Sequence, residues 1–245
     1  MSQMISACAD SRAPSAPDLE RLRAEIDRID EALLGLIEQR LAKAGAIAAL
    51  KVKEQPNCLR LRPDRERNVL DRISRRAGSL PEPAVRTIWR ELMGLSLQAQ
   101  SRTEIVLCAP HRPILIADAA RLRFGCQAPM LAAENAEEAL DRARTNEAVA
   151  VIELSPLCDW WVALVACQEL TIFDCLEDIE GRVVALLVGR VSRNDSGAEP
   201  AYPILKDAAL RRRMGEGEPI RPLAISGEHR LCMIRSKPVA VEPSR

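Results

Sequence analysis

The chain has 245 residues, a length that accommodates two modest domains. It is 47% hydrophobic and 29% charged, which is typical of globular proteins and excludes a wholly disordered chain. Its 35 basic residues equal its 35 acidic residues, and this zero formal net charge speaks against a general nucleic-acid binder.

The first predicted element is a long helix over residues 19–53, preceded by a segment, residues 1–17, that we expect to be disordered. Its apolar residues have helical spacing, at positions 19, 22, 26, 29, 33, 36, 37, 44, 47 and 48. Asp18 can cap its start. Such a helix is about 50 Å long, more than one small domain covers, so its apolar stripe predicts a partner chain. We interpret Gly35 and Gly45 as points of close helix–helix approach.

Two shorter helices follow the long one. Pro56 cannot continue a helical hydrogen-bond ladder, so the long helix must end before it. A second helix is predicted over 63–77, beginning with a proline and ending just before Gly78. A third is predicted over 81–101. Residues 18–101 are thus expected to form an all-α unit of three helices.

Polar side chains interrupt the apolar faces of this unit. Arg40 and Lys51 are eleven residues apart, which places them about 20° apart around the helix, and Arg23 falls on the same line. Ser96 and Gln100 interrupt the third helix in the same way. An ordinary ion pair or snorkelling explains any single arginine of this kind more simply. Because buried charge must be compensated, the whole set leaves two interpretations open, internal ion pairs or a pocket for an anion.

Residues 19–100 resemble the all-helical chorismate mutases. The resemblance rests on five segments that occur in the family's order: LxxLRxxIDxID with Arg23, EQR with Arg40, AxLK with Lys51, DRERNVLDRI with Arg65 and Glu66, and SLQAQ with Ser96 and Gln100. Each segment alone is weak, but their order and spacing are specific. The resemblance implies an intertwined homodimer in which the long helices pair.

The resemblance assigns four of these residues to the carboxylates of the substrate, chorismate. Arg40 would bind one carboxylate, supported by Arg65. Arg23 would reach the same pocket from the partner chain, across the dimer interface. Ser96 would contact a carboxylate as well.

The remaining residues would act at the ether oxygen and the ring hydroxyl. Lys51 would reach the ether oxygen and a carboxylate, and Gln100 would donate to the same ether oxygen. Glu66 would hold the ring hydroxyl. With Arg40, these three are the predicted catalytic residues. Arg62 stands where many members carry an aspartate that frames the hydroxyl side of the pocket. The shape of the pocket rim on that side is therefore not predicted.

The predicted activity is that of a chorismate mutase, an isomerase that rearranges chorismate to prephenate in aromatic amino acid biosynthesis. Such a reaction needs orientation of the substrate and fixed donors at the ether oxygen, so no cofactor or metal is expected. Two alternatives remain, an isochorismate pyruvate lyase of the same fold and a non-catalytic regulatory protein. Glu66, placed for a ring hydroxyl, favours the mutase over the lyase. The complete set of seven polar residues speaks against the regulatory protein.

Residues 102–236 alternate short apolar runs with amphipathic segments, which predicts an α/β domain. Strands are expected over 103–109, 129–134, 148–154, 170–176 and 183–191, with a strand pair near 220–235. Helices are expected near 113–124, 135–146, 158–167 and 204–214. We interpret 174–182 as a solvated acidic turn and 237–245 as a loose tail.

By its position, this second half resembles a shortened, degenerate prephenate dehydratase lobe. The Thr-Arg-Phe and Glu-Ser-Arg-Pro motifs of that family are absent from the sequence, so we expect no dehydratase activity. We also expect no catalytic group from this half, so that a chain ending near residue 102 should keep mutase activity. Trp160 and Trp161 are interpreted as buried anchors.

Eight scattered cysteines and two histidines form no CxxC or other metal-binding spacing. A signal peptide is not predicted, and no run of 18 apolar residues is present, so we expect no membrane association. We interpret the cysteines as reduced and the protein as cytoplasmic.

Overall fold

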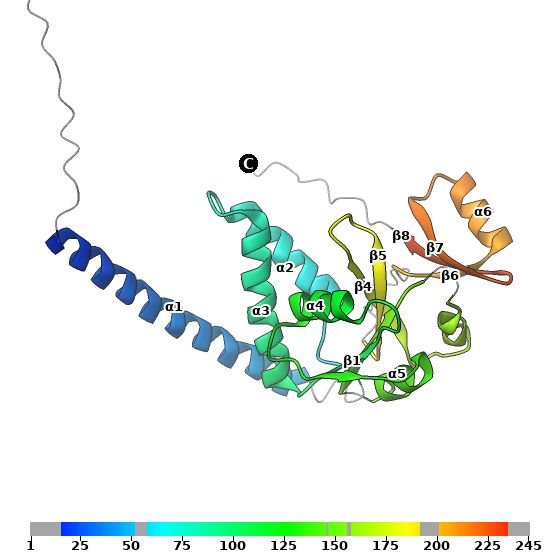
Figure 1. The fold of residues 1–245 in the computed structure, drawn as a ribbon, viewed down its shortest axis with the longest axis horizontal. Coiled ribbons are helices and arrows are strands. Elements are labelled where there is room, and N and C mark those ends of the chain that lie inside the picture. The colour runs from blue at the N-terminus through cyan, green and yellow to red at the C-terminus, as the bar shows by residue number, and fades with distance from the viewer. Residues whose placement is uncertain (1–15, 52–57, 146, 156–157, 192–200, 235–245) are drawn as a thin grey trace, which may run out of the picture. The chain divides into compact units, whose positions relative to one another are not determined.

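The structure is a computed structural model that describes residues 16–51, 58–145, 147–155, 158–191 and 201–234, without the side chains of residues 16, 17 and 51 (Figure 1). The predicted segment 1–17 lies outside these residues except for its last two positions, which begin the first helix. The predicted break at Pro56 and the tail 237–245 also lie outside them. The chain divides into two compact units, residues 1–43 and 44–245.

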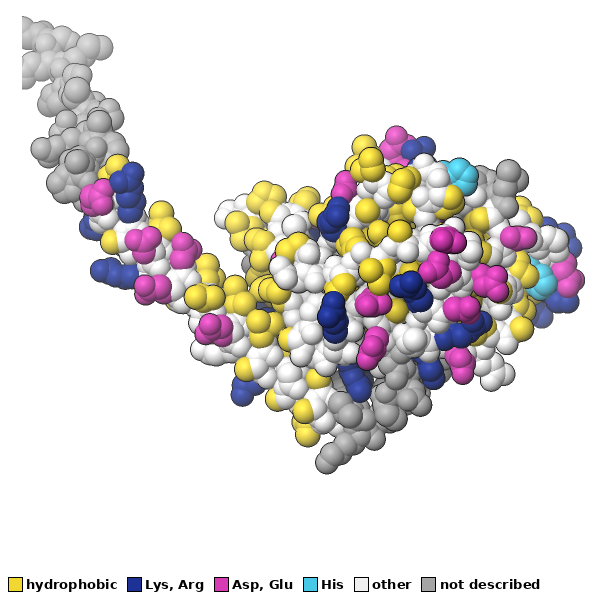
Figure 2. All heavy atoms as spheres, turned by 60° about the horizontal axis from the view of Figure 1, so that its bottom comes forward, with side chains coloured by type: hydrophobic (Ala, Val, Ile, Leu, Met, Phe, Trp, Pro, Cys, Tyr) yellow, Lys and Arg dark blue, Asp and Glu magenta, His cyan; other side chains and the backbone are white. Residues whose placement is uncertain are grey.

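The first helix, α1, spans Ala16–Lys51 and begins before the predicted cap. Asp18 lies within its first turn, where a negative charge is favourable at the positive end of the helix dipole. Large apolar side chains along α1 are exposed (Figure 2): Leu19, Leu22, Ile26, Ile29, Leu33, Leu34, Leu36, Ile47 and Leu50. Outside the backbone of α1 itself, no described atom lies within 4 Å of a Cβ built at Gly35 or Gly45, so the described part of this chain makes no close approach there.

Helices α2 (Pro63–Arg76) and α3 (Glu82–Gln100) agree with the prediction to within about one residue at each end. Leu70 and Val85 are buried on this pair of helices. Arg86 of α3 contacts Asp71 of α2 at 2.9 Å, from its Nη2 to the carboxylate Oδ1. Gly78 has φ +59°, a left-handed conformation that favours glycine, and it turns the chain between the two helices.

The second half is built on a five-stranded sheet in the order β2-β1-β3-β5-β4. The strands are β1 (Glu104–Cys108), β2 (Met130–Ala132), β3 (Ala148–Glu153), β4 (Thr171–Glu177) and β5 (Val183–Gly189). The first three are parallel, and β5 pairs antiparallel with β3 and β4. The predicted fold class, three helices followed by an α/β region, is confirmed.

Helices α4 (Pro113–Phe124) and α5 (Ala136–Ala143) cover opposite faces of this sheet. The step from β1 to β2 and the step from β2 to β3 run in opposite directions across the sheet, so two right-handed crossovers place their helices on opposite faces. Alternate residues of β3 follow this division: Val149 and Val151 pack with α4, whereas Ala150 and Ile152 pack with α5. Every residue of β3 is buried, as expected for a strand covered on both faces.

A smaller antiparallel sheet, β6-β8-β7, ends the described chain. It contains β6 (Ile204–Lys206), β7 (Ile220–Ser226) and β8 (His229–Ile234), with helix α6 (Asp207–Gly215) between β6 and β7. The predicted helix 204–214 is wrong at its start, because its first three residues form β6. The predicted strand pair corresponds to β7 and β8.

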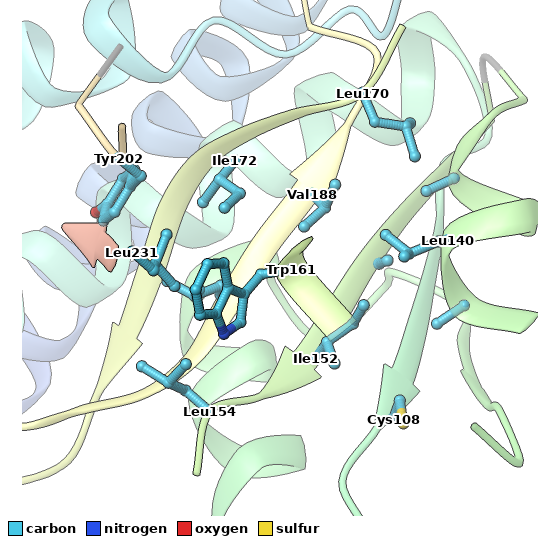
Figure 3. Packing of buried hydrophobic residues seen from close by; sticks show 14 of the residues in the cluster. Cys108, Leu140, Ile152, Leu154, Trp161, Leu170, Ile172, Val188, Tyr202 and Leu231 are labelled. Atoms are coloured by element: carbon cyan, nitrogen blue, oxygen red, sulfur yellow. The ribbon is translucent and has the colours of Figure 1, made fainter. Parts of the chain in front are cut away.

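The segment predicted as a helix over 158–167 is a short 3-10 helix, η1 (Trp160–Val165). Trp161 is fully buried and donates from its indole N–H to the Cys158 carbonyl at 3.0 Å. It packs among aliphatic residues that include Ile152 of the main sheet, Leu154 just after β3, and Leu231 of the small sheet (Figure 3). Its role as a buried anchor is thus confirmed, whereas Trp160 is only half-buried and donates from its indole N–H to the Glu153 carbonyl at 3.2 Å.

Helix α3 and the segment before α2 share their core with the main sheet. Leu59 and Leu61, which precede α2, and Leu97 of α3 belong to the same buried cluster as the α4 face of the sheet. The Leu59 N–H donates to the Arg190 carbonyl at 2.8 Å, which ties the segment before α2 to the end of β5. Among the described residues, no helix is long and apolar enough to cross a membrane.

Candidate active site

Two of the seven predicted residues, Arg23 and Arg40, lie on α1 in the unit of residues 1–43. Arg23 is exposed and pairs with Glu20 one turn earlier, from its Nη1 to Oε1 at 2.8 Å. Arg40 is half-buried, and this burial lowers the pKa of its guanidinium. The two arginines are separated by 17 residues of continuous helix, or about 25 Å. That separation is too large for both arginines of one chain to bind the same small molecule.

Lys51 is the last residue of α1, and its side chain lies outside the described part of the structure. The other four predicted residues lie on α2 and α3. The structure therefore does not by itself bring the seven side chains together, and their roles remain predictions.

Arg65 and Glu66 occupy the first turn of α2. Their position follows from Pro63, which is favourable at the first position of a helix, and from Arg62, whose carbonyl accepts the Glu66 N–H at 3.0 Å. Adjacent helical residues point about 100° apart. Arg65 is exposed, whereas the Glu66 side chain is only 19% exposed.

Glu66 is held by an arginine of the second half of the chain. Arg123, on the last turn of α4, contacts Glu66 Oε2 from Nη2 at 2.7 Å and Asp174 Oδ2 of β4 from Nε at 2.9 Å. Burial acts to lower the pKa of Arg123, but the charges of the two carboxylates raise it overall. Burial, and then the charge of Arg123, lower the pKa of Arg90 on α3 next to this group.

The sequence prediction missed this ion-pair group, and it was wrong about Asp174. The segment 174–182 was interpreted as a solvated turn, but its first four residues belong to β4, and Leu176 is buried. Only residues after β4 form the turn, in which Asp178 accepts N–H groups from Glu180 and Arg182.

Ser96 and Gln100 lie one turn apart on α3, as the spacing predicts. Ser96 is buried, and its Oγ donates to the Leu92 carbonyl at 2.7 Å, a common way to satisfy a serine inside a helix. Gln100 is half-buried in the last turn.

The end of α3 is fixed by its neighbours. Gln98 exchanges two hydrogen bonds with the backbone of Thr103, which is fully buried. At Gly94, a Cβ would lie 2.1 Å from the Phe124 carbonyl oxygen, so α3 and α4 approach more closely than a larger residue allows. In Figure 1 α4 is seen next to α3 and running across its direction. These contacts hold the stretch of α3 that carries Ser96 and Gln100.

Comparison with known proteins gives a family match over the residues of these helices. Residues 22–101 match the family model of chorismate mutase type II. This part of the chain is a chorismate mutase domain. The match covers about a third of the chain, ends one residue after α3, and confirms the resemblance predicted from the five segments.

A relative of the chorismate mutase domain was found in Aquifex aeolicus. It is a bifunctional chorismate mutase/prephenate dehydratase, 32% identical over 98 residues. The similarity covers 38% of this chain but only 26% of the relative, so the chain matches about a quarter of that protein's length. No solved structure shows significant similarity to the chain.

The residues of the chorismate mutase domain offer chemistry suited to an anionic substrate. Arginine, lysine and glutamine side chains supply N–H donors and positive charge, and one carboxylate can accept a hydroxyl. Among the residues that the structure describes, no group of three or more histidine, cysteine, aspartate and glutamate side chains could hold a metal ion.

Proposed function

We propose that the protein is a chorismate mutase, which rearranges chorismate to prephenate. The observation that carries this proposal is the family match over residues 22–101, together with all seven polar residue types at the family's spacing. The relative from Aquifex aeolicus, which is named for the same activity, supports it.

Binding of the two substrate carboxylates would orient the molecule for an intramolecular rearrangement. Arg40, with Arg65 and Ser96, would hold them in one pocket, and Arg23 of a second copy would complete it. Holding the reacting atoms of one molecule close together removes much of the entropic part of the barrier. No nucleophile or general base is needed for such a step.

The breaking C–O bond places negative charge on the ether oxygen in the transition state. Lys51 and Gln100 would donate to that oxygen, and fixed donors of this kind stabilise developing charge without rearranging during the reaction. Glu66 would accept a hydrogen bond from the ring hydroxyl, which does not react, and so would mainly contribute to substrate binding and orientation.

We propose that the active form is a homodimer. The distance of about 25 Å between Arg23 and Arg40 along α1 requires a second chain if both bind one substrate. The exposed apolar side chains of α1 supply a surface for that partner. An isologous dimer would complete two such pockets at once.

We place the reaction in the cytoplasm. The seven cysteines that the structure describes are all free, as a reducing compartment favours. For the second half we propose no dehydratase activity, because the Thr-Arg-Phe and Glu-Ser-Arg-Pro motifs are absent.

The test is to follow the loss of chorismate absorbance with the purified full-length protein and to identify the product. We expect prephenate and no phenylpyruvate. Incubation with isochorismate serves as the control for the lyase of the same fold, and we expect no pyruvate. Absence of prephenate from a folded, dimeric protein would show that the proposed function is wrong.

A further inference from the structure

Arg123 connects the chorismate mutase domain to the α/β half through a side chain that the mechanism above does not use. Its guanidinium is 10% exposed and lies between Glu66 of α2 and Asp174 of β4. These three residues are contributed by a helix of the mutase domain, a helix that covers the sheet, and a strand of the sheet. All three lie in the compact unit of residues 44–245.

The contact leaves part of the Glu66 carboxylate available. Arg123 lies 2.7 Å from Oε2 in an ion pair, although this buried oxygen accepts no hydrogen bond from the described residues, and no interaction of Oε1 with them is found. A carboxylate has acceptor sites on both oxygens. One oxygen can therefore be fixed by Arg123 while the other accepts a hydroxyl.

Docking of α2 and α3 onto the sheet does not depend on this ion pair. Leu59, Leu61 and Leu97 are buried in the shared core, and the backbones of α3 and α4 meet at Gly94. Buried ion pairs contribute little net stability compared with apolar contacts, but they impose a specific geometry on their members. The consequence of the Arg123 contact is thus the orientation of Glu66.

The position of Arg123 is itself tied to the helix that carries other predicted site residues. Arg123 precedes Phe124, whose carbonyl lies against Gly94, and Gly94 is two residues before Ser96. The end of α4 is thereby packed against α3. A rigid support of this kind is what a side chain needs in order to fix a neighbour's position.

We infer that Arg123 is a positioning residue for the mutase reaction, which holds the Glu66 carboxylate so that its free oxygen faces the ring hydroxyl of the substrate. This inference rests on the proposed function. It makes the α/β half a structural part of the mutase site, although that half contributes no group that touches the substrate.

The experiment uses full-length protein and measures kcat and KM for chorismate separately. The ring hydroxyl does not react, so a displaced Glu66 should weaken the binding of the substrate and of the transition state by the same amount. Such a loss raises KM and leaves kcat nearly unchanged. For Arg123→Met we expect KM to rise about tenfold or more, with kcat changed less than about threefold. Arg123→Lys keeps a cation but loses the planar guanidinium, whose separate nitrogens face the two carboxylates. We expect its KM to lie between those of the wild type and Arg123→Met.

Arg112→Met is the matched control. Arg112 precedes the first residue of the same helix and binds the buried Glu153, from Nε to Oε1 at 2.8 Å. It lies eleven residues from Arg123, at the opposite end of α4. Its loss also breaks an arginine–carboxylate pair of α4, but we expect KM to stay within about twofold of the wild type, because Glu66 is untouched.

A double-mutant cycle with Glu66→Gln separates positioning from general destabilisation. If Arg123 acts through Glu66, Arg123→Met should have little further effect on KM in the Glu66→Gln protein. If Arg123→Met does not fold, the same cycle is made with Arg123→Lys. Suppose that the wild type is active. If the Arg123 variant then has an unchanged KM, or if the KM effects of the Arg123 and Glu66 substitutions are additive, this inference alone is overturned. An inactive wild type would overturn the proposed function and the inference together.

Discussion

The helices of the chorismate mutase domain are packed in two different ways. The part of α1 within residues 16–43 exposes most of its large apolar side chains, whereas Leu70 of α2 and Val85 of α3 are buried, and Leu97 of α3 is buried in the cluster that includes the sheet. The difference shows that this domain does not have a core of its own within one chain. Its second and third helices depend on the α/β half, and its first helix has an apolar surface suited to another copy.

The largest effect is expected when the α/β half is removed. A chain that ends after Ser101 would expose Leu59, Leu61 and Leu97, and burial of each such side chain stabilises by about 1.5–3 kcal/mol. Their sum is comparable to the whole stability of many domains. We therefore expect loss of folding and of mutase activity, measured by circular dichroism and chorismate consumption.

This expectation reverses the one drawn from the sequence, in which residues 18–101 fold and act alone. A soluble fragment with wild-type mutase activity would show that the second copy, and not the sheet, covers those leucines. The full-length protein at the same concentration is the control.

Substitution of Lys51, the last residue of α1, should change catalysis and not folding. Replacement by Met keeps most of the stem and removes the charge. A donor to a developing oxyanion is worth roughly 2.7–4 kcal/mol, so we expect kcat to fall at least about a hundredfold. We expect the melting temperature to stay equal or rise, since a cation kept for the substrate costs stability while no substrate is bound. Near-normal kcat in a folded Lys51→Met dimer would exclude Lys51 from the site.

Gly94 tests the close packing of α3 against α4, with a smaller effect. A Cβ at this position would meet the Phe124 carbonyl at 2.1 Å, so Gly94→Ala must shift one of the backbones. We expect a loss of about 1–3 kcal/mol in the free energy of unfolding, measured with urea.

Gly215→Ala is the control, since nothing lies within 4 Å of its Cβ position at the end of α6. It should change the free energy of unfolding by less than about 1 kcal/mol. Equal effects of the two substitutions would show that α3 and α4 are not packed as closely as described.

Sequence patterns predicted the elements well because their signals are local. The helix expected over 113–124 has those bounds in the structure, and apolar spacing located the five strands of the main sheet. The short strand β6 was missed because three residues next to a helix carry no alternation of their own. The helix expected over 158–167 is a 3-10 helix of six residues, a length at which apolar spacing does not distinguish the 3-10 period from the α period.

The contacts between elements could not be predicted in the same way. Arg123 lies 57 residues from Glu66 and 51 from Asp174, and no periodic pattern links residues at such distances. The close approach of α3 and α4 at Gly94 was not predicted either, and that expected at Gly35 and Gly45 stays a prediction for contacts with a partner chain. Sequence spacing reports the face of one element and not the partner that packs on it.

The most direct test of the shared-site dimer is complementation between two inactive variants. Arg23→Ala and Lys51→Ala proteins are mixed under conditions that exchange subunits, and exchange is verified by differential labelling. Each heterodimer contains one pocket with both residues intact, so a statistical mixture should recover about a quarter of wild-type mutase activity. No recovery despite proven exchange would contradict a site built from two chains.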